Sequence, residues 1–362
     1  MLTLLLLYLF SFASTAKLTE PDCGLRTTGA ETLDRTRIPY PHSFSKEDSL
    51  EGGRPANVKV AVQHPDKLRL NVAYVEYPLS AVGYVTSSVS GGCHGQLVNY
   101  CTVAIASHCI KDKKGKLAEK LMITTSDGKE RPLLNPEAPD WMTYRKENGK
   151  DIEVYHPDKD VAFVQIDRKD GELQWPGESL GTFQVPYFGP NDLNRGGEKY
   201  CNFGKIHDRE GMTDNPNIDV DIKFYGRSVV PGSPDNYVGH NTNGGRGASG
   251  SGFFICDPKT ETKTVGDKKV KELVSLGLKI EWNNRKKVSE PVAVMIGIFT
   301  NVNEELNDKL NKLKRPMTDQ EANDPKNRSH AILNNAYIDR LIPYLKNNPC
   351  NRLPSTKVMA SK

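Results

Sequence analysis

A serine lies at the centre of a glycine-rich segment that runs directly into an apolar strand. The segment is Gly244 to Phe254, GGRGASGSGFF, with Ser249 in its middle. A serine that attacks a carbonyl must expose its hydroxyl on a sharp bend, beside backbone N–H groups that bind the developing oxyanion. Flanking glycines allow the bend because they adopt positive φ, so the amides of Gly247 and Ser249 are candidates for an oxyanion hole. The same pattern occurs in flexible surface loops, so the hypothesis requires a histidine and an aspartate elsewhere.

The candidate histidine is His108, at the end of the segment CHGQLVNYCTVAIASHC that runs from Cys93 to Cys109. A disulfide between these two cysteines would hold the ring rigidly at the end of a buried strand while leaving one edge free. It would contribute about 3 kcal/mol by restricting the unfolded chain. A buried histidine on its own is more often a satisfied core residue. The neighbouring cysteine and the later serine favour a role as general base.

The candidate aspartate is Asp160, which opens the apolar strand VAFVQI. An aspartate at the start of a strand is commonly only turn chemistry, and Asp158 lies two residues earlier. Asp160 directly precedes the buried run, so we expect it rather than Asp158 to lie behind the histidine.

The composition is that of an ordinary globular protein. The chain has 362 residues, of which 37% are hydrophobic and 26% are charged, enough for one large core or two modest ones. Its 49 Lys and Arg against 45 Asp and Glu give a formal charge of +4. This excess is small and evenly spread, so we expect no nucleic-acid partner.

The first residues predict secretion. Met1 to Ala16 is an apolar run that ends in small residues, which fits a signal peptide cleaved after Ala16, although a basic start is missing. The alternative is a membrane anchor, but the run is shorter than the roughly 20 residues a spanning helix needs. Most of the seven cysteines of a secreted chain should be paired, and their odd number leaves at least one over. Asn327 opens a possible glycosylation sequon.

The remaining pattern predicts two β-rich halves. Residues 17–56 are rich in turn formers and form an N-terminal extension, whereas short β-type runs separated by Pro and Gly follow from Asn57 to Val302. Close spacing of such strands favours β-barrels, so we predict an all-β fold with a cleft between two barrels. We place the boundaries as follows: first barrel 57–190, second barrel 191–302, charged insertion 303–330, C-terminal helix 331–348 with Pro343 inside it, tail 349–362.

The order His108, Asp160, Ser249 resembles that of the chymotrypsin-like serine proteases. Hydrolases with a G-x-S-x-G elbow and subtilisins use other orders. Several segments carry the resemblance further. They are CHGQLVN and ASHC around the histidine, DVAFVQI after the aspartate, YCNFG at 200–204, LVSLG at 273–277 and GIFTNV at 297–302. The resemblance implies two six-stranded antiparallel β-barrels with the active site between them, and no cofactor or metal.

The resemblance also implies a role for each residue. Ser249 would be the nucleophile, His108 the general base and then acid, and Asp160 the carboxylate that orients the imidazole. Ser275 would donate a hydrogen bond to that aspartate. The amides of Gly247 and Ser249 would bind the oxyanion.

A disulfide and a specificity pocket follow from the same resemblance. It pairs Cys201 with Cys256, just after the serine. It places Asn243 at the base of the substrate pocket, with Gly277 and Gly297 on the walls. A neutral Asn243 makes strict preference for Arg or Lys unexpected. Cys23, Cys101 and Cys350 are left open, a bridge from Cys23 to Cys350 being one option.

One departure from the family concerns activation. Ala248 precedes the serine, where trypsin relatives carry an aspartate that pairs with a newly cut N-terminus. The stretch Leu50 to Gly53 is only weakly similar to the activation site, and GASGSG is closer to the bacterial glutamyl endopeptidases. We therefore expect an oxyanion hole that forms without N-terminal insertion, and a large gain in activity on cleavage at Leu50 would contradict this.

Three functions are compatible with these residues. The first is a secreted, monomeric serine endopeptidase that acts on protein or peptide substrates. Protein inhibitors are possible partners of such an enzyme, and no membrane association is expected after signal cleavage. The second is a protease-like binding protein with a silent site. The third is an esterase that uses the same three residues.

Overall fold

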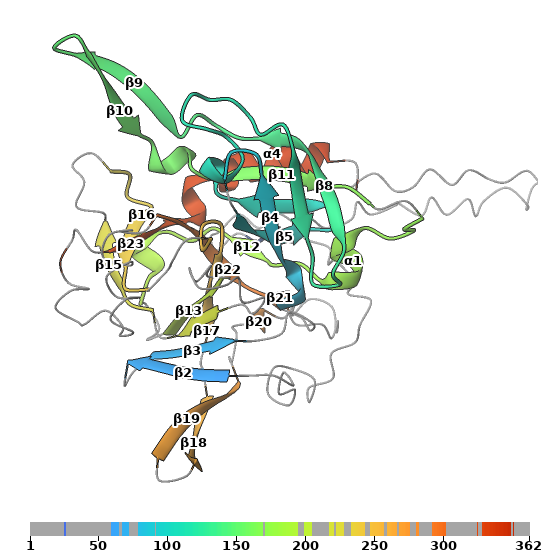
Figure 1. The fold of residues 1–362 in the computed structure, drawn as a ribbon, viewed down its shortest axis with the longest axis vertical. Helices are drawn as coiled ribbons and strands as arrows, with labels where there is room; N and C mark the ends of the chain where they lie inside the picture. The colour runs from blue at the N-terminus through green and yellow to red at the C-terminus, as the bar shows by residue number, and fades with distance from the viewer. Residues whose placement is uncertain are drawn as a thin grey trace, which may run out of the picture.

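Six strands in the first half of the chain close into a β-barrel in the order β11-β6-β5-β4-β7-β8 in the computed structural model (Figure 1). Every neighbouring pair is antiparallel. The barrel strands are β4 Val82–Ser87, β5 Cys93–Asn99, β6 Thr102–Ile105, β7 Leu121–Thr124, β8 Glu130–Glu137 and β11 Ala162–Ile166. This barrel agrees with the predicted first β-barrel.

The structure describes the parts of the chain that form these and the following elements. These parts are residues 25–26, 59–64, 67–71, 79–90, 92–168, 171–194, 199–204, 217–220, 222–227, 233–242, 247–256, 259–265, 268–275, 280–281, 292–301, 324, 328–348 and 350. The predicted signal peptide, Cys23, Asn327 and most of the charged insertion and tail lie outside them. No helix in these ranges is long and apolar enough to cross a membrane.

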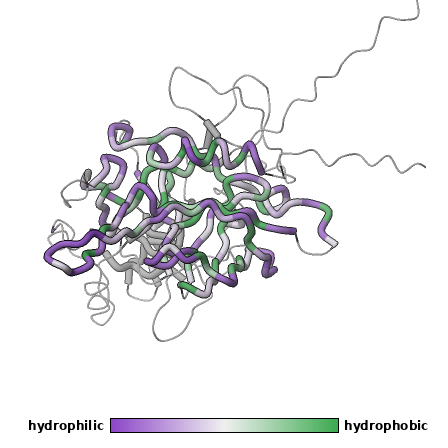
Figure 2. Tube along the Cα trace, turned by 90° about the horizontal axis from the view of Figure 1, so that it is seen from above, coloured by the Kyte–Doolittle hydropathy of each residue, from purple (hydrophilic) through white to green (hydrophobic). Residues whose placement is uncertain are grey.

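Buried residues explain why the barrel forms where it does. Strands β5, β6 and β11 are buried along their whole length, whereas β4 and β7 carry partly exposed positions. Strands buried on both faces are covered both inside the barrel and outside it. Figure 2 shows hydrophobic and hydrophilic stretches alternating along the described chain.

The second half forms one nine-stranded sheet rather than a six-stranded barrel among the described strands. Its order is β15-β16-β23-β22-β17-β13-β14-β3-β2. The strands are β2 Lys59–His64, β3 Lys67–Asn71, β13 Lys199–Gly204, β14 Asn217–Val220, β15 Phe224–Arg227, β16 Tyr237–His240, β17 Gly252–Cys256, β22 Met295–Asn301 and β23 Ser329–Leu333.

Two strands that were assigned to the first barrel belong to this sheet. Strand β3 pairs antiparallel with β14, and β2 pairs with β3, so residues 59–71 extend the second half. The sequence pattern gives each strand its period but not its partner, because pairing over long separations is a tertiary choice.

Among the described strands, four two-stranded pairings lie outside the two large sheets. They join β1 Leu25–Arg26 to β12 Val185–Pro186, β9 Met142–Glu147 to β10 Lys150–Tyr155, β18 Lys259–Val265 to β19 Lys268–Ser275, and β20 Ile280–Glu281 to β21 Val292–Ala293. The β9–β10 hairpin projects from the body at the top left of Figure 1 and returns the chain to Asp160. The described residues also contain α1 Pro176–Leu180 and the 3-10 turns Leu79–Ala81, Ser107–Cys109, Pro157–Lys159, Pro190–Asp192 and Asn334–Ala336.

The C-terminal helix α4 spans Ile338–Asn347, shorter than the predicted 331–348, with Pro343 inside it. Residues 331–333 instead belong to β23, between β16 and β22. All three are fully buried, as a strand between two neighbours requires, whereas α4 buries only one face, at Ile338, Leu341 and Leu345. The helical period therefore begins later than the apolar run does.

Helix α4 is tied to the barrel near Asp160. Arg340 donates from Nη1 to the Glu137 carboxylate at 2.9 and 3.0 Å and from Nη2 to the Val161 carbonyl at 2.9 Å. Cys350 forms a disulfide with Cys101, so the option of a Cys23 to Cys350 bridge was wrong. These contacts hold the start of β11, which follows Asp160.

Removing this disulfide should lower stability without touching the candidate catalytic residues. It links residues 249 positions apart. We expect the double variant Cys101→Ser/Cys350→Ser to lose about 2–5 kcal/mol of unfolding free energy, because the unfolded chain regains the entropy that the bridge removes. Urea unfolding of the double and both single variants tests this, and all three should lose about the same amount. An unchanged midpoint would contradict a bridge between these two cysteines.

Candidate active site

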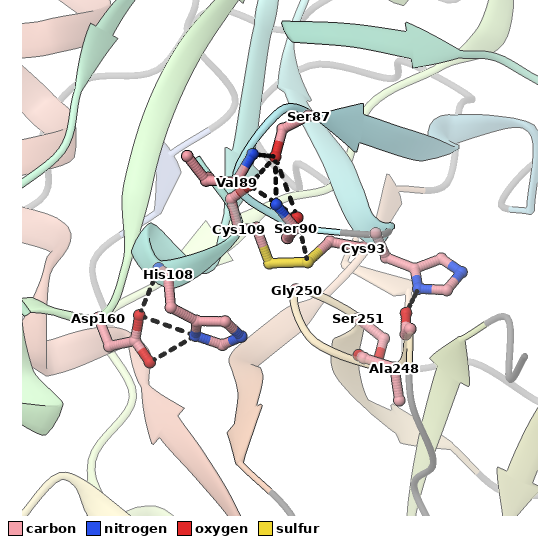
Figure 3. Close-up of a disulfide and its surroundings, with 12 residues drawn as sticks. Ser87, Val89, Ser90, Cys93, His108, Cys109, Asp160, Ala248, Gly250 and Ser251 are labelled. Atoms are coloured by element: carbon pink, nitrogen blue, oxygen red, sulfur yellow. Dashed lines mark hydrogen bonds and ion pairs between the residues drawn. A yellow bond between two sulfur atoms is a disulfide. The ribbon is translucent and has the colours of Figure 1, made fainter. Parts of the chain in front are cut away.

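His108 is fixed at the end of barrel strand β6 by its neighbours. The strand ends at Ile105 and a 3-10 turn, Ser107–Cys109, carries the histidine. The disulfide from Cys109 to Cys93 ties this turn to the start of β5, and the Cys109 carbonyl accepts hydrogen bonds from Ser87 Oγ at 2.6 Å and Ser90 Oγ at 2.9 Å (Figure 3). The histidine backbone therefore has little freedom to move.

The structure brings His108 and Asp160 together. The ring Nδ1 lies 2.8 Å from Asp160 Oδ2 and 3.1 Å from Oδ1, and the His108 backbone N–H donates to Oδ1 at 2.9 Å (Figure 3). The Asp160 side chain is 1% exposed and that of His108 is 23% exposed. Since a carboxylate only accepts, Nδ1 carries the proton that it donates, which leaves a lone pair on Nε2 of the neutral ring. Asp158, the competing carboxylate, lies in the 3-10 turn before it.

The aspartate also sets the proton affinity of the histidine. Burial lowers the pKa of His108, but the charge of Asp160 and its hydrogen bond raise it and prevail, so the pKa lies above its ordinary value. The pair therefore gives a stronger base than an isolated imidazole in the same place.

A third side chain contacts the aspartate, and it was not predicted from the sequence. Tyr155, the last residue of β10, donates from its hydroxyl to Asp160 Oδ2 at 2.8 Å. Burial raises the pKa of Tyr155 well above its ordinary value, and the nearby Asp160 and Tyr237 raise it further. The phenol therefore keeps its proton and remains a donor. The sequence offers only a tyrosine five residues before the aspartate, which no motif marks.

A row of aromatic rings packs beside His108 and Tyr155. Trp141 lies edge-on to His108 at 5.8 Å between ring centroids and to Tyr155 at 6.2 Å, and Tyr155 lies edge-on to Tyr237 at 6.0 Å. Tyr237 belongs to β16, so this cluster joins the barrel side of the site to the nine-stranded sheet.

Ser249 lies in a turn of residues 247–251, which we call the serine turn, directly before β17. Strand β22 holds it from one side, since Gly250 N–H donates to the Phe299 carbonyl and Phe299 N–H donates to the Ser251 carbonyl, both at 2.8 Å. Barrel strand β5 holds it from the other, since His94 N–H donates to the Ser249 carbonyl at 2.7 Å.

Gly250 shows how closely the turn approaches the barrel. Its φ is +81°, a conformation that favours glycine, and a Cβ at this position would lie 2.0 Å from the His94 carbonyl oxygen. The glycine therefore serves both the bend and the contact with β5.

The two serines of the turn differ in their surroundings. Ser251 is fully buried, and its hydroxyl donates to the Ala248 carbonyl and accepts a hydrogen bond from Asn202 Nδ2 at 3.3 Å. Ser249 is half-buried, and in the described part of the chain its hydroxyl has no hydrogen-bond partner. Ser251 is thus engaged in holding the turn, while Ser249 is available.

No hydrogen bond joins His108 to Ser249 within the described residues. Figure 3 shows the ring edge opposite Asp160 pointing to the side where Ala248 and Gly250 lie. A base and its nucleophile are often further apart without substrate and close in the complex, so this spacing is compatible with catalysis.

The other predicted site residues are located only in part. Asn243 and Gly277 lie outside the described residues, and Ser275 is described only as the end of β19, opposite Lys259. Gly297 is buried in β22, where a Cβ would lie 2.8 Å from the Ile332 carbonyl oxygen. Its missing side chain serves the packing of β22 against β23. Cys201 and Cys256 form the disulfide expected from the sequence, as do Cys93 and Cys109.

One grouping of metal-ligand types falls at this site. A ring nitrogen of His108 and the sulfurs of Cys93 and Cys109 lie within 4.8 Å of one another. The two sulfurs are bonded to each other, and a disulfide does not supply the thiolate that binds metals. This group is therefore structural.

Comparisons with known proteins gave matches by structure only. No family model and no curated protein matches the sequence. The similar solved structures include the protease Anisep from Arthrobacter nicotinovorans, with 16% identity over 65% of this chain and 87% of that one and a TM-score of 0.42. A Glu endopeptidase has 13% identity over 79% of this chain and 100% of that one, with a TM-score of 0.46. Mouse neuropsin, a serine protease, has 13% identity over 74% of this chain and 94% of that one, with a TM-score of 0.41. Because these scores are low, we base the proposal below on the contacts of this chain.

The hydrogen bond from Tyr155 to Asp160 can be tested by substitution. Tyr155→Phe removes one donor from Asp160 and keeps the ring, so we expect kcat/KM to fall about tenfold, the effect of losing about 1.4 kcal/mol from a hydrogen bond to a charged group. The rate of cleavage of a peptide substrate measures this. Tyr144→Phe, an exposed tyrosine on the same hairpin, is the matched control and should be unaffected. Equal rates for the two variants would exclude a role for the Tyr155 hydroxyl.

Proposed function

We propose that the chain is a secreted serine endopeptidase that cleaves peptide bonds through an acyl-enzyme on Ser249. One observation carries the proposal. The buried Asp160 carboxylate holds Nδ1 of the half-buried His108, while the hydroxyl of Ser249 is available on the serine turn. That turn is hydrogen-bonded to strand β5, and β5 is linked to the residue after His108 by the Cys93–Cys109 disulfide.

The chemistry follows from the protonation of these groups. Neutral His108 keeps a lone pair on Nε2, so it can take the proton from Ser249 Oγ as the hydroxyl attacks the substrate carbonyl. The ring then becomes an imidazolium, which the adjacent Asp160 charge stabilises, and returns the proton to the leaving amine. Water repeats the sequence and releases the acid product.

The oxyanion would be bound by backbone amides of the serine turn. Gly247 has a φ of +89° and Ser249 is two residues further on, so both N–H groups belong to the bend that presents the hydroxyl. The loss of one such donor typically costs about 10²- to 10³-fold in rate.

Compartment and substrate preference are the finer parts of the proposal. Three disulfides in the described residues fit an oxidising environment, in agreement with the expected signal at Met1 to Ala16. The resemblance of GASGSG to glutamyl endopeptidases and the neutral Asn243 favour a P1 residue other than Arg or Lys.

A fluorophosphonate probe tests the nucleophile directly, because it labels only an activated serine. We expect the wild type to be labelled, Ser249→Ala and His108→Ala to lose labelling, and Ser251→Ala to retain it. Labelling of wild type no faster than of Ser249→Ala would show that the protein is not a working serine hydrolase. Digestion of a peptide library by the unlabelled wild type then separates a protease from an esterase and gives the P1 preference.

The pH dependence tests the His108–Asp160 pair. Activity requires unprotonated Nε2, so kcat/KM should fall as the pH decreases, with a midpoint above the ordinary histidine pKa of about 6.5 because Asp160 stabilises the imidazolium. Asp160→Asn removes the charge, so the midpoint should move to lower pH, and kcat should fall about 10⁴-fold. Burial and, to a lesser extent, the charge of Arg328 together lower the pKa of His330 to about 4, so that residue does not titrate in the same range. An acid optimum would contradict the role of His108.

A further inference from the structure

The side chain of His94 contacts the serine turn at a point that the proposed mechanism leaves unexplained. His94 is the second residue of β5 and is 1% exposed. Its Nδ1 lies 2.7 Å from the Gly247 carbonyl oxygen. A carbonyl only accepts, so Nδ1 is the donor, and it carries a proton whether the ring is neutral or charged.

The serine turn needs such a contact because its own residues provide little restraint at this end. Gly247 has no side chain and a positive φ, and Ala248 is buried with only a methyl group. A glycine can rotate its neighbouring peptides at little cost, which would turn amides away from the place where an oxyanion forms. In the described part of the turn, the carbonyl of Gly247 is held by His94.

His94 holds both ends of the segment that contains Ala248. The imidazole binds the carbonyl of Gly247 and the backbone N–H binds the carbonyl of Ser249, each at 2.7 Å. Gln96 Nε2, on the same strand, donates to the Gly250 carbonyl at 3.2 Å. Strand β5 is itself anchored by the Cys93–Cys109 disulfide, so these bonds fix the turn relative to His108.

We propose that His94 is a positioning residue that locks the Gly247–Ala248 peptide and thereby keeps the amides of Gly247 and Ser249 directed at the oxyanion. The proposal rests on the function proposed above. Ala248 has no charged group that could hold the turn. In this proposal His94, a buried side chain of the barrel, holds it instead. The turn is then formed in the folded chain, without a preceding cleavage.

Three substitutions separate the hydrogen bond from the volume of the ring. In His94→Asn, an amide N–H occupies a position equivalent to Nδ1, at the same number of bonds from the backbone. In His94→Gln the amide lies one bond further out, and in His94→Leu there is no donor. The two amide variants are similar in polarity, so they differ mainly in where the donor is.

We expect the loss of the donor to affect the transition state rather than substrate binding. For His94→Leu and His94→Gln, kcat should fall about 10- to 100-fold while KM changes by less than about threefold, because a turn displaced by an ångström loses oxyanion contacts made only in the transition state. His94→Asn should recover most of that loss. Affinity for a peptide aldehyde, which forms a tetrahedral adduct with the serine, should fall in parallel with kcat.

The outcomes decide the proposal separately from the function. If the wild type is not labelled by a fluorophosphonate, the proposed function fails and this inference fails with it. If the wild type is labelled, the inference is overturned by Leu and Gln variants that match its kcat, or by an Asn variant no faster than Gln. Thermal unfolding of each variant completes the test. Asn, Gln and Leu variants that all fail to fold would assign His94 to the fold alone and would equally overturn the proposal.

Discussion

The contact between barrel strand β5 and the serine turn is the constraint on which the site depends. His108 and Asp160 lie at strand ends of the barrel, whereas Ser249 lies just before strand β17 of the nine-stranded sheet. The backbone bond from His94 to Ser249 and the close approach of Gly250 to the His94 carbonyl set the distance between these two units. A side chain at position 250 would force them apart. The glycine of the turn is therefore as important for joining the halves as for exposing the hydroxyl.

The second requirement is a buried carboxylate whose two oxygens both have hydrogen-bond partners. A buried Asp160 would be costly if its oxygens lacked partners. Here Oδ1 accepts from the His108 backbone and both oxygens contact Nδ1, while Oδ2 also accepts from Tyr155. These donors satisfy both carboxylate oxygens although the side chain is 1% exposed, and Asp160 raises the pKa of the histidine. The energetic cost of burial is thus offset by the same bonds that orient the base.

The sequence predicted the local features of this arrangement better than its long-range contacts. His108, beside a cysteine at the end of a β-branched run, and Asp160, before an apolar run, could be located because strand ends and turns are written in neighbouring residues. The partner of Cys350, the sheet to which residues 59–71 belong and the strand at 329–333 could not. Each depends on which distant segment packs alongside, and a short apolar run fits a strand or a helix equally well. His94 could not be predicted for the same reason, since it contacts Gly247 across 153 residues. Tyr155 lies only 5 residues from Asp160, but no motif marks it and its contact depends on how the chain turns between them.

Two separate contacts span the site, one beside each of its ends. Beside the serine, β5 holds the turn through His94 and Gln96. Beside the aspartate, Tyr155 donates a hydrogen bond to Asp160 and packs edge-on against Tyr237 of β16. The Tyr237 ring stacks on His330 of β23. A displacement of the sheet relative to the barrel would therefore disturb the turn and the carboxylate together. Because aromatic edges and backbone bonds tolerate little displacement, the geometry of serine, histidine and aspartate depends on the packing of the two halves more than on any single loop.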